Sequence, residues 1–313
     1  MDKQQVIRMR DYFINYWKNI GRLTLQQEIY LKRLEIKIYP FTDSGAAGYY
    51  SSDDNSISIN SAYTNQFILK QTVFHELDHA RTSFVKNGKR LTGMWTEQNG
   101  TWNKVEKKLN EPTKGEFFGE GITACNGESV YYAYKNQNWY EKPKQQPDMI
   151  GGRKQLFPGH TFPSGLWWYK LNGNFISQLA AVMGLTDNEF CALADNGNGR
   201  EIISKKFNEL NNDQKYTFEV IENMLDCVGI TAKLALYGVE LNKDEMRKYN
   251  KYIIDCQDLI CAKLMAAYRT GTITESEFIK RFDRFNRYVT TNSRQDVYVN
   301  AVYDNLHEHN NNV

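Results

Sequence analysis

Cysteine is scarce in this chain of 313 residues: there are five, an odd number, and no two of them form a CxxC pair. Disulfide frameworks and cysteine-based zinc sites both need paired spacings. We therefore interpret the cysteines as free thiols in a reducing compartment and not as metal ligands. They are Cys125, Cys191, Cys227, Cys256 and Cys261.

An excess of charge of either sign is also missing, because 39 basic and 37 acidic residues leave a formal net charge of +2. This balance favours neither nucleic acid nor an anionic membrane as the main partner. No run approaches the roughly 18 uncharged apolar residues of a transmembrane helix. The first ten residues, MDKQQVIRMR, lack the apolar segment of a secretory signal. We expect a cytoplasmic protein, with export by a non-classical route and the oligomeric state left open.

The N-terminal part mixes helical and strand patterns. Apolar residues at helical spacing predict a helix or a helix pair over residues 4–33. Residues 34–39 and 56–60 alternate between apolar and polar side chains, which predicts two strands of a small sheet. Residues 66–86 contain neither glycine nor proline and predict one long helix that ends at Asn87-Gly88.

The rest of the chain is mostly helical in pattern. The polar segment 89–115 predicts a surface loop, a second helix is expected over 119–134, and the proline- and glycine-rich segment 136–165 predicts a linker or a cleft-lining loop. Further helices are expected over 167–184, 186–195, 200–210, 213–237, 243–268, 274–290 and 294–308.

A short acidic and glycine-rich sequence, DNGNG at 195–199, has the composition of a calcium-binding loop. The EF-hand spacing fails, because oxygen ligands are missing at the third and fifth positions and Lys206 occupies the twelfth. We interpret this sequence as a plain turn.

One five-residue motif carries specific chemistry. His75-Glu76-Leu77-Asp78-His79 is an HExxH sequence within the helix predicted over 66–86. Residues four apart share one face of a helix, so both imidazoles can reach the same ion, and zinc favours nitrogen ligands in tetrahedral geometry. Glu76 is predicted to act as the general base toward water. The alternative is an exposed helix that carries two solvated histidines.

A catalytic zinc site also needs a third protein ligand. We predict Glu120, in the sequence GEGIT at 119–123 that opens the second helix. Glu116 and Glu128 stay open as alternatives. The three-histidine pattern of the metzincins is excluded, because Val85 stands where that pattern requires histidine.

The two motifs HELDH and GEGIT together resemble those of the gluzincins, the thermolysin-like zinc metallopeptidases, over roughly residues 34–135. The resemblance implies an α+β, mainly helical, zincin-like fold with a small N-terminal sheet, two ligand helices and a helical C-terminal lobe. It implies hydrolysis of peptide bonds, with Zn²⁺ as the cofactor and Glu76 as the base. The metal ligands that it implies are His75, His79 and Glu120. We expect a catalytic subdomain over 1–150 and a helical subdomain over 151–313.

Two positions depart from the gluzincin pattern. The family usually has Asp or Glu four residues after the ligand glutamate, where it orients a ligand histidine, and this chain has Ala124. Because such an outer group normally fixes the imidazole tautomer, we expect Glu128 or Thr123 to take this role. Asp78 replaces the small residue that is common before the second histidine.

The oxyanion formed during peptide hydrolysis needs a hydrogen-bond donor in addition to the metal. Gluzincins use a tyrosine or a histidine of the cleft for this purpose. Tyr169 and His160 are our candidates, because both lie at the end of the proline-rich segment or just beyond it.

Three functions follow from these patterns. The preferred one is a zinc-dependent peptidase acting on a peptide or protein substrate. The alternative is a zincin-fold regulatory or binding protein, ImmA/IrrE-like or a degenerate peptidase, that acts on one specific protein partner. A toxin-like effector peptidase is a more distant option.

Overall fold

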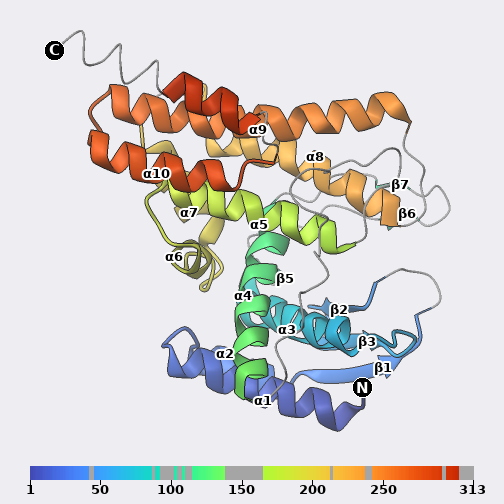
Figure 1. Ribbon diagram of the computed structural model, residues 1–313. Helices are drawn as coiled ribbons and strands as arrows, with labels where there is room; N and C mark the ends of the chain where they lie inside the picture. The colour runs from blue at the N-terminus through green and yellow to red at the C-terminus, as the bar shows by residue number, and fades with distance from the viewer. Residues whose placement is uncertain are drawn as a thin grey trace.

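The computed structural model of the chain describes residues 1–41, 46–86, 89–91, 102–103, 108–109, 115–137, 165–211, 214–236, 242–290 and 294–302. It is mainly helical with one small three-stranded sheet, as the sequence predicts. Figure 1 shows the N-terminal helices and this sheet in one layer, and the helices after residue 165 in another. The helix α4 (Glu116–Gln137) runs between the two layers. No described helix combines the length and the apolar composition that a membrane crossing requires.

The N-terminal layer begins with the predicted helix pair, α1 (Lys3–Asn19) and α2 (Leu25–Lys32). Each helix starts with a capping box, in which the side chain of Asp2 or Thr24 accepts a hydrogen bond from a backbone N–H of the first turn. The buried side chains of α1 recur at helical spacing and face the core of this layer. They are Val6, Met9, Phe13, Ile14 and Trp17.

The sheet has the strand order β1-β3-β2, with β3 parallel to β1 and antiparallel to β2. Its strands are β1 (Glu35–Tyr39), β2 (Gly48–Ser51) and β3 (Ser56–Asn60). The central strand β3 is buried along its whole length. The alternation in the sequence predicts β1 and β3 but misses β2, because four residues are too few for a period of two to stand out.

The motif helix α3 (Gln66–Thr82) is shorter than predicted. Asn65 caps its first turn, and the hydroxyls of Thr82 and Ser83 donate to carbonyls of its last turn. Such side-chain bonds compete with the backbone ladder and favour a helix end, so the expected continuation to residue 86 is wrong. Four short strands follow: β4 (Phe84–Lys86), β5 (Lys89–Leu91), β6 (Trp102–Asn103) and β7 (Lys108–Leu109).

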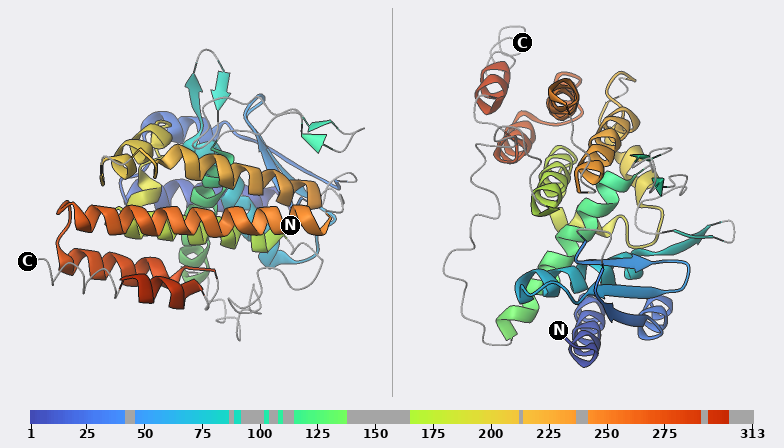
Figure 2. Two further views of the ribbon diagram at one scale, coloured as in Figure 1. Left: turned by 90° about the horizontal axis from the view of Figure 1, so that it is seen from above. Right: turned by 90° about the vertical axis from the view of Figure 1, so that its right-hand side faces the viewer.

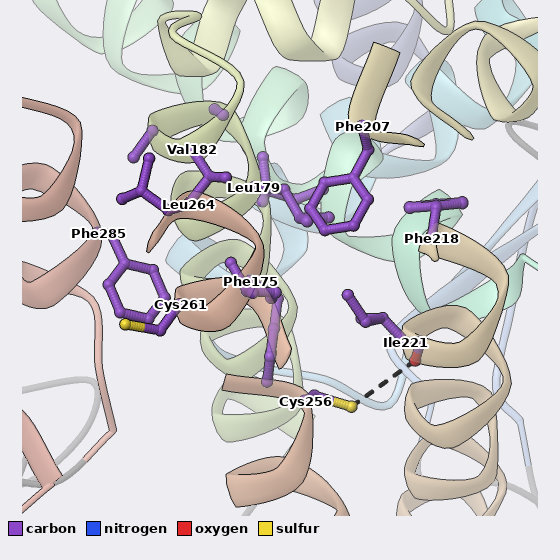
Figure 3. Packing of buried hydrophobic residues seen from close by; sticks show 14 of the residues in the cluster. Phe175, Leu179, Val182, Phe207, Phe218, Ile221, Cys256, Cys261, Leu264 and Phe285 are labelled. Carbon is purple, nitrogen blue, oxygen red and sulfur yellow. Dashed lines mark hydrogen bonds between the residues drawn. The ribbon is translucent and has the colours of Figure 1, made fainter. Parts of the chain in front are cut away.

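Beyond α4 the predicted helices are confirmed, with boundaries shifted by a few residues. They are α5 (Gly165–Val182), α6 (Asp187–Ala192), α7 (Gly199–Asn208), α8 (Phe218–Leu236), α9 (Lys243–Arg269) and α10 (Glu275–Arg287), followed by a helical segment at 294–302. The remainder of the last predicted helix, 303–308, lies outside the described residues. Figure 2 shows the long helix α9 lying beside α5 and α10. Figure 3 shows Phe175 and Leu179 of α5 among side chains from α7, α8, α9 and α10. This cluster is the core of the helical lobe.

The helix α4 contributes to two separate hydrophobic cores. Phe117, Phe118 and Ile122, near its start, belong to the core of the helical lobe. Val130 and Tyr131, two to three turns later, belong to the core formed by α1, α3 and the sheet. The two layers of the molecule are therefore joined through one continuous helix.

Two glycines let α4 approach its neighbours closely. A Cβ atom at Gly127 would lie 3.0 Å from the backbone nitrogen of His75 and 3.1 Å from its Cα. A Cβ atom at Gly121 would lie 3.0 Å from Cβ of Asn172 on α5. These positions favour glycine because any side chain there would push α4 away from α3 or from α5.

We expect Gly127→Ala to destabilise the protein, although alanine is the better helix former by about 1 kcal/mol. The added methyl group would meet the buried backbone of α3, and overpacking typically costs about 1–3 kcal/mol. The matched control is Gly173→Ala in α5, where a Cβ atom would meet only Cys125 Sγ at 3.8 Å. Urea unfolding should show Gly173→Ala at or above wild-type stability and Gly127→Ala below it. Equal stability of the two variants would contradict the close packing.

Candidate metal centre

The HExxH motif lies in a completely buried part of α3. All residues from Val73 to Thr82 are buried, and His75 and His79 expose only 8% and 9% of their surfaces. Their imidazole rings, one helical turn apart, contact each other with centroids 4.7 Å apart. The alternative of two solvated histidines on an exposed helix is therefore wrong.

The close packing of α4 on α3 brings Glu120 to the two histidines. The Nε2 atoms of His75 and His79 lie 3.1 Å apart. Glu120 places Oε2 at 3.1 Å from Nε2 of His75 and Oε1 at 3.4 Å from Nε2 of His79. Two imidazole nitrogens and a carboxylate thus converge on one point from two helices.

This donor set fits a divalent metal. One ligand atom from each of His75, His79 and Glu120 lies within 4.8 Å of the others. Two nitrogens bound at about 2.0–2.1 Å to a tetrahedral zinc would be roughly 3.3 Å apart, close to the 3.1 Å between the two Nε2 atoms. The three residues predicted as ligands from the sequence therefore form a group that could hold a metal ion.

The rival glutamates lie elsewhere on α4. Glu116 is buried in the first turn of the helix, and Glu128 is exposed near its middle. In the part of the chain that the structure describes, neither belongs to a group that could hold a metal. Among the three carboxylates considered, only Glu120 lies beside the histidines.

Charge within the cluster shifts the titration of its members. Burial opposes protonation of His79, but the adjacent Glu120 carboxylate outweighs burial and raises the pKa of His79 to about 9. Burial would likewise raise the pKa of the Glu120 carboxyl, but the two imidazoles hold this pKa well below its usual range. A metal ion at this site must therefore displace a proton from His79 at neutral pH.

The predicted base, Glu76, is buried beside the cluster. Burial raises the pKa of its carboxyl above the usual value, while the two histidines partly offset this effect. The carboxylate also accepts a backbone hydrogen bond from Tyr50, on the edge strand β2. A carboxylate with a raised pKa is suited to accept and return a proton near neutral pH.

No family model, no curated protein and no solved structure matches this chain.

The outer partner of His79 is a hydroxyl group. The fully buried Thr123 places Oγ1 at 3.4 Å from Nδ1 of His79. Of the two substitutes expected for the missing carboxylate, the structure thus brings Thr123 to the site. With Nε2 of His79 facing Glu120, the hydroxyl oxygen can accept a hydrogen bond from Nδ1–H and hold the ring in this orientation.

The two oxyanion candidates stay predictions. His160 lies outside the described residues. Tyr169 falls within α5, but its side chain also lies outside what the structure describes.

Sequence reasoning missed the partners of Asp78. Its Oδ1 atom accepts a hydrogen bond from Nε of Arg81 at 2.6 Å, and its Oδ2 atom accepts one from Nδ2 of Asn126 at 3.0 Å. The spacing of Asp78 and Arg81 does predict the first of these bonds, because opposite charges three residues apart lie on one face of a helix. Asp78 thus links α3 to α4 directly beside His79.

We expect chelator-treated protein to hold a proton on His79 up to a pH near 9, because Glu120 stabilises the charged imidazole. NMR titration of the histidine ring protons measures this directly. Addition of zinc at pH 7.5 should then release about one proton per chain. In Glu120→Gln the pKa of His79 should fall, because the carboxylate that raises it is gone. A wild-type His79 that titrates at or below about 6.5, its ordinary range, would contradict this account.

We expect Thr123→Val to weaken zinc binding by about tenfold, the lower end of the usual effect of losing an outer hydrogen bond to a ligand histidine. Thr123→Ser keeps the hydroxyl and should bind zinc as the wild type does. Competition with a chromophoric chelator measures both dissociation constants. Equal affinity of the valine variant and the wild type would remove Thr123 from this role.

Proposed function

We propose that the protein is a zinc-dependent peptidase of zincin type, with His75, His79 and Glu120 as the metal ligands and Glu76 as the general base. The observation that carries the proposal is the convergence of the two Nε2 atoms and the Glu120 carboxylate in a buried group. Glu76 lies close enough for both imidazoles and Glu120 to affect its pKa.

Charge balance supports a divalent cation at this position. A metal ligand histidine must be neutral, so with a metal bound the cluster would carry the two negative charges of Glu76 and Glu120 and no positive charge from His75 or His79. Buried charges of one sign are strongly unfavourable without compensation. A 2+ ion compensates both carboxylates, and zinc suits a mixed set of imidazole and carboxylate ligands.

The chain's own residues account for the proton transfers of peptide hydrolysis. Bound zinc would supply Lewis acidity, which polarises the scissile carbonyl and makes water more acidic. Glu76 accepts a proton from the attacking water on its carboxylate and then donates it to the nitrogen of the leaving amine. Thr123 holds the ring of His79 in the orientation that directs Nε2 toward the metal. Tyr169 and His160 are proposed as donors to the oxyanion.

The choice of a peptide bond as the substrate rests on the resemblance of HELDH and GEGIT to the gluzincin motifs. The alternative, a regulatory or binding zincin, is favoured by one feature, the presence of Ala124 where gluzincins have an acidic residue. The two proposals differ in whether the zinc-loaded protein cuts peptides.

We expect Glu76→Gln to retain about one zinc per chain, because Glu76 is not a ligand in this scheme, and to lose peptide cleavage by about 10²–10⁴-fold, because the proton acceptor is gone. Metal content is measured by mass spectrometry of the purified protein, and cleavage by digestion of a peptide library. The exposed Glu201→Gln on α7 is the control and should match the wild type in both measurements.

Three results would contradict the proposal. A wild-type protein that stays free of zinc after supplementation would remove the metal site. A zinc-loaded wild type that cleaves no peptide would favour the binding protein. A Glu76→Gln variant that cleaves peptides as the wild type does would remove Glu76 as the base.

A further inference from the structure

A network of four charged side chains, two of them fully buried, includes Asp78, the direct neighbour of His79. Arg81 is fully buried and donates to Asp78 Oδ1 at 2.6 Å, to Asp195 Oδ1 at 2.7 Å and to the carbonyl oxygen of Arg22 at 3.2 Å. Arg22 donates to both carboxylate oxygens of Asp195, at 2.7 and 2.9 Å. Both guanidinium groups lie over the ring of Trp17, at 4.2 and 4.6 Å from its centroid.

The network joins segments that are far apart in the sequence. Arg22 precedes α2, Arg81 is in the last turn of α3, and Asp195 lies between α6 and α7. Gln27 of α2 adds two hydrogen bonds, from Nε2 to the carbonyl oxygens of Arg81 and Asp195, at 2.9 and 2.8 Å. The turn predicted at 195–199 thus brings a side chain of the helical lobe into the N-terminal layer.

The ligands of the proposed metal site are divided between the two layers. His75 and His79 belong to α3, which packs in the N-terminal core. Glu120 lies between Phe118 and Ile122, in the half of α4 that packs in the helical core. The distance between Glu120 and the histidines therefore depends on how the two cores are held together.

The network contacts α3, α4 and the helical lobe, so it can affect the distance between Glu120 and the histidines. Asp78 directly precedes His79 and also accepts a hydrogen bond from Asn126 of α4. Asp195 connects the same arginine of α3 to the helical lobe. Because Arg81 is buried and bonded to both aspartates, displacement of Asp195 would leave an N–H group of a buried guanidinium without its charged acceptor, which is costly. The contact between Arg81 and Asp195 therefore favours one placement of the helical lobe against α3.

We propose that Asp195 and Arg81 are positioning residues that hold the helical lobe against α3, so that Glu120 stays within metal-binding reach of His75 and His79. This inference rests on the proposed metal site. A merely structural ion pair would stabilise the fold without affecting the metal affinity of the folded protein.

The experiment compares the wild type with Asp195→Asn and with the milder Arg22→Gln, which removes one arm of the network and leaves Arg81 paired. Zinc dissociation constants are measured by chelator competition, and the ligand geometry by the visible absorption of the Co²⁺-substituted protein. Circular dichroism shows whether each variant is folded. Asp258→Asn is the control, because it breaks another Arg–Asp pair, that of Arg294 with Asp258 on α9.

We expect both network variants to bind zinc about 10- to 100-fold more weakly, as is usual when groups behind metal ligands are changed, and to show an altered Co²⁺ spectrum. The control should keep the wild-type affinity and spectrum, even if it unfolds at a lower temperature. Folded network variants with wild-type affinity and spectrum would overturn the positioning role. A wild type that binds neither metal would instead overturn the proposed metal site, and this inference with it.

Discussion

The polar side chains in the second half of α3 are buried, and their need for hydrogen-bond partners determines which elements pack around this helix. Five charged or titratable residues lie within two helical turns, all of them buried: His75, Glu76, Asp78, His79 and Arg81. Such groups are tolerated in a protein interior only when they are hydrogen-bonded or paired. Their partners come from α4, from the edge strand β2 and from the turn at Asp195. These elements must therefore surround α3.

The buried charges of α3 are compensated in two different ways. On one side, two arginines and two aspartates form a network that is neutral in itself. On the other side, two carboxylates face two histidines, and neutrality requires protons or a divalent cation. The proton on His79 that Glu120 stabilises compensates one of the two carboxylates, and the divalent metal that we propose would replace this proton and compensate both. The neutral arginine–aspartate network is suited to holding α3 rigidly in place. The group of histidines and glutamates is suited to binding a cation and transferring protons.

The helix α4 makes this arrangement possible because it belongs to both cores. Its first turns pack among the helices of the C-terminal lobe, and its last turns pack against the N-terminal layer. Gly127 removes the side chain that would otherwise separate it from the backbone of His75. A site assembled from two cores is sensitive to their relative placement, so contacts far from the histidines and Glu120 can affect the geometry of the group that they form.

Features that depend on local periodicity can be predicted from the amino-acid pattern. The spacing of His75 and His79 places both on one side of a helix, wherever that helix packs, and the helix pair, β1, β3 and most helices of the second lobe follow from patterns of the same kind. The four residues of β2 were too few for such a pattern, and the hydroxyls of Thr82 and Ser83 ended α3 earlier than its composition predicts. The pattern leaves open which of Glu116, Glu120 and Glu128 lies beside the histidines, because this depends on which part of α4 packs against α3. The same holds for the bond between Arg81 and Asp195, which are 114 residues apart and meet only when two cores are packed together.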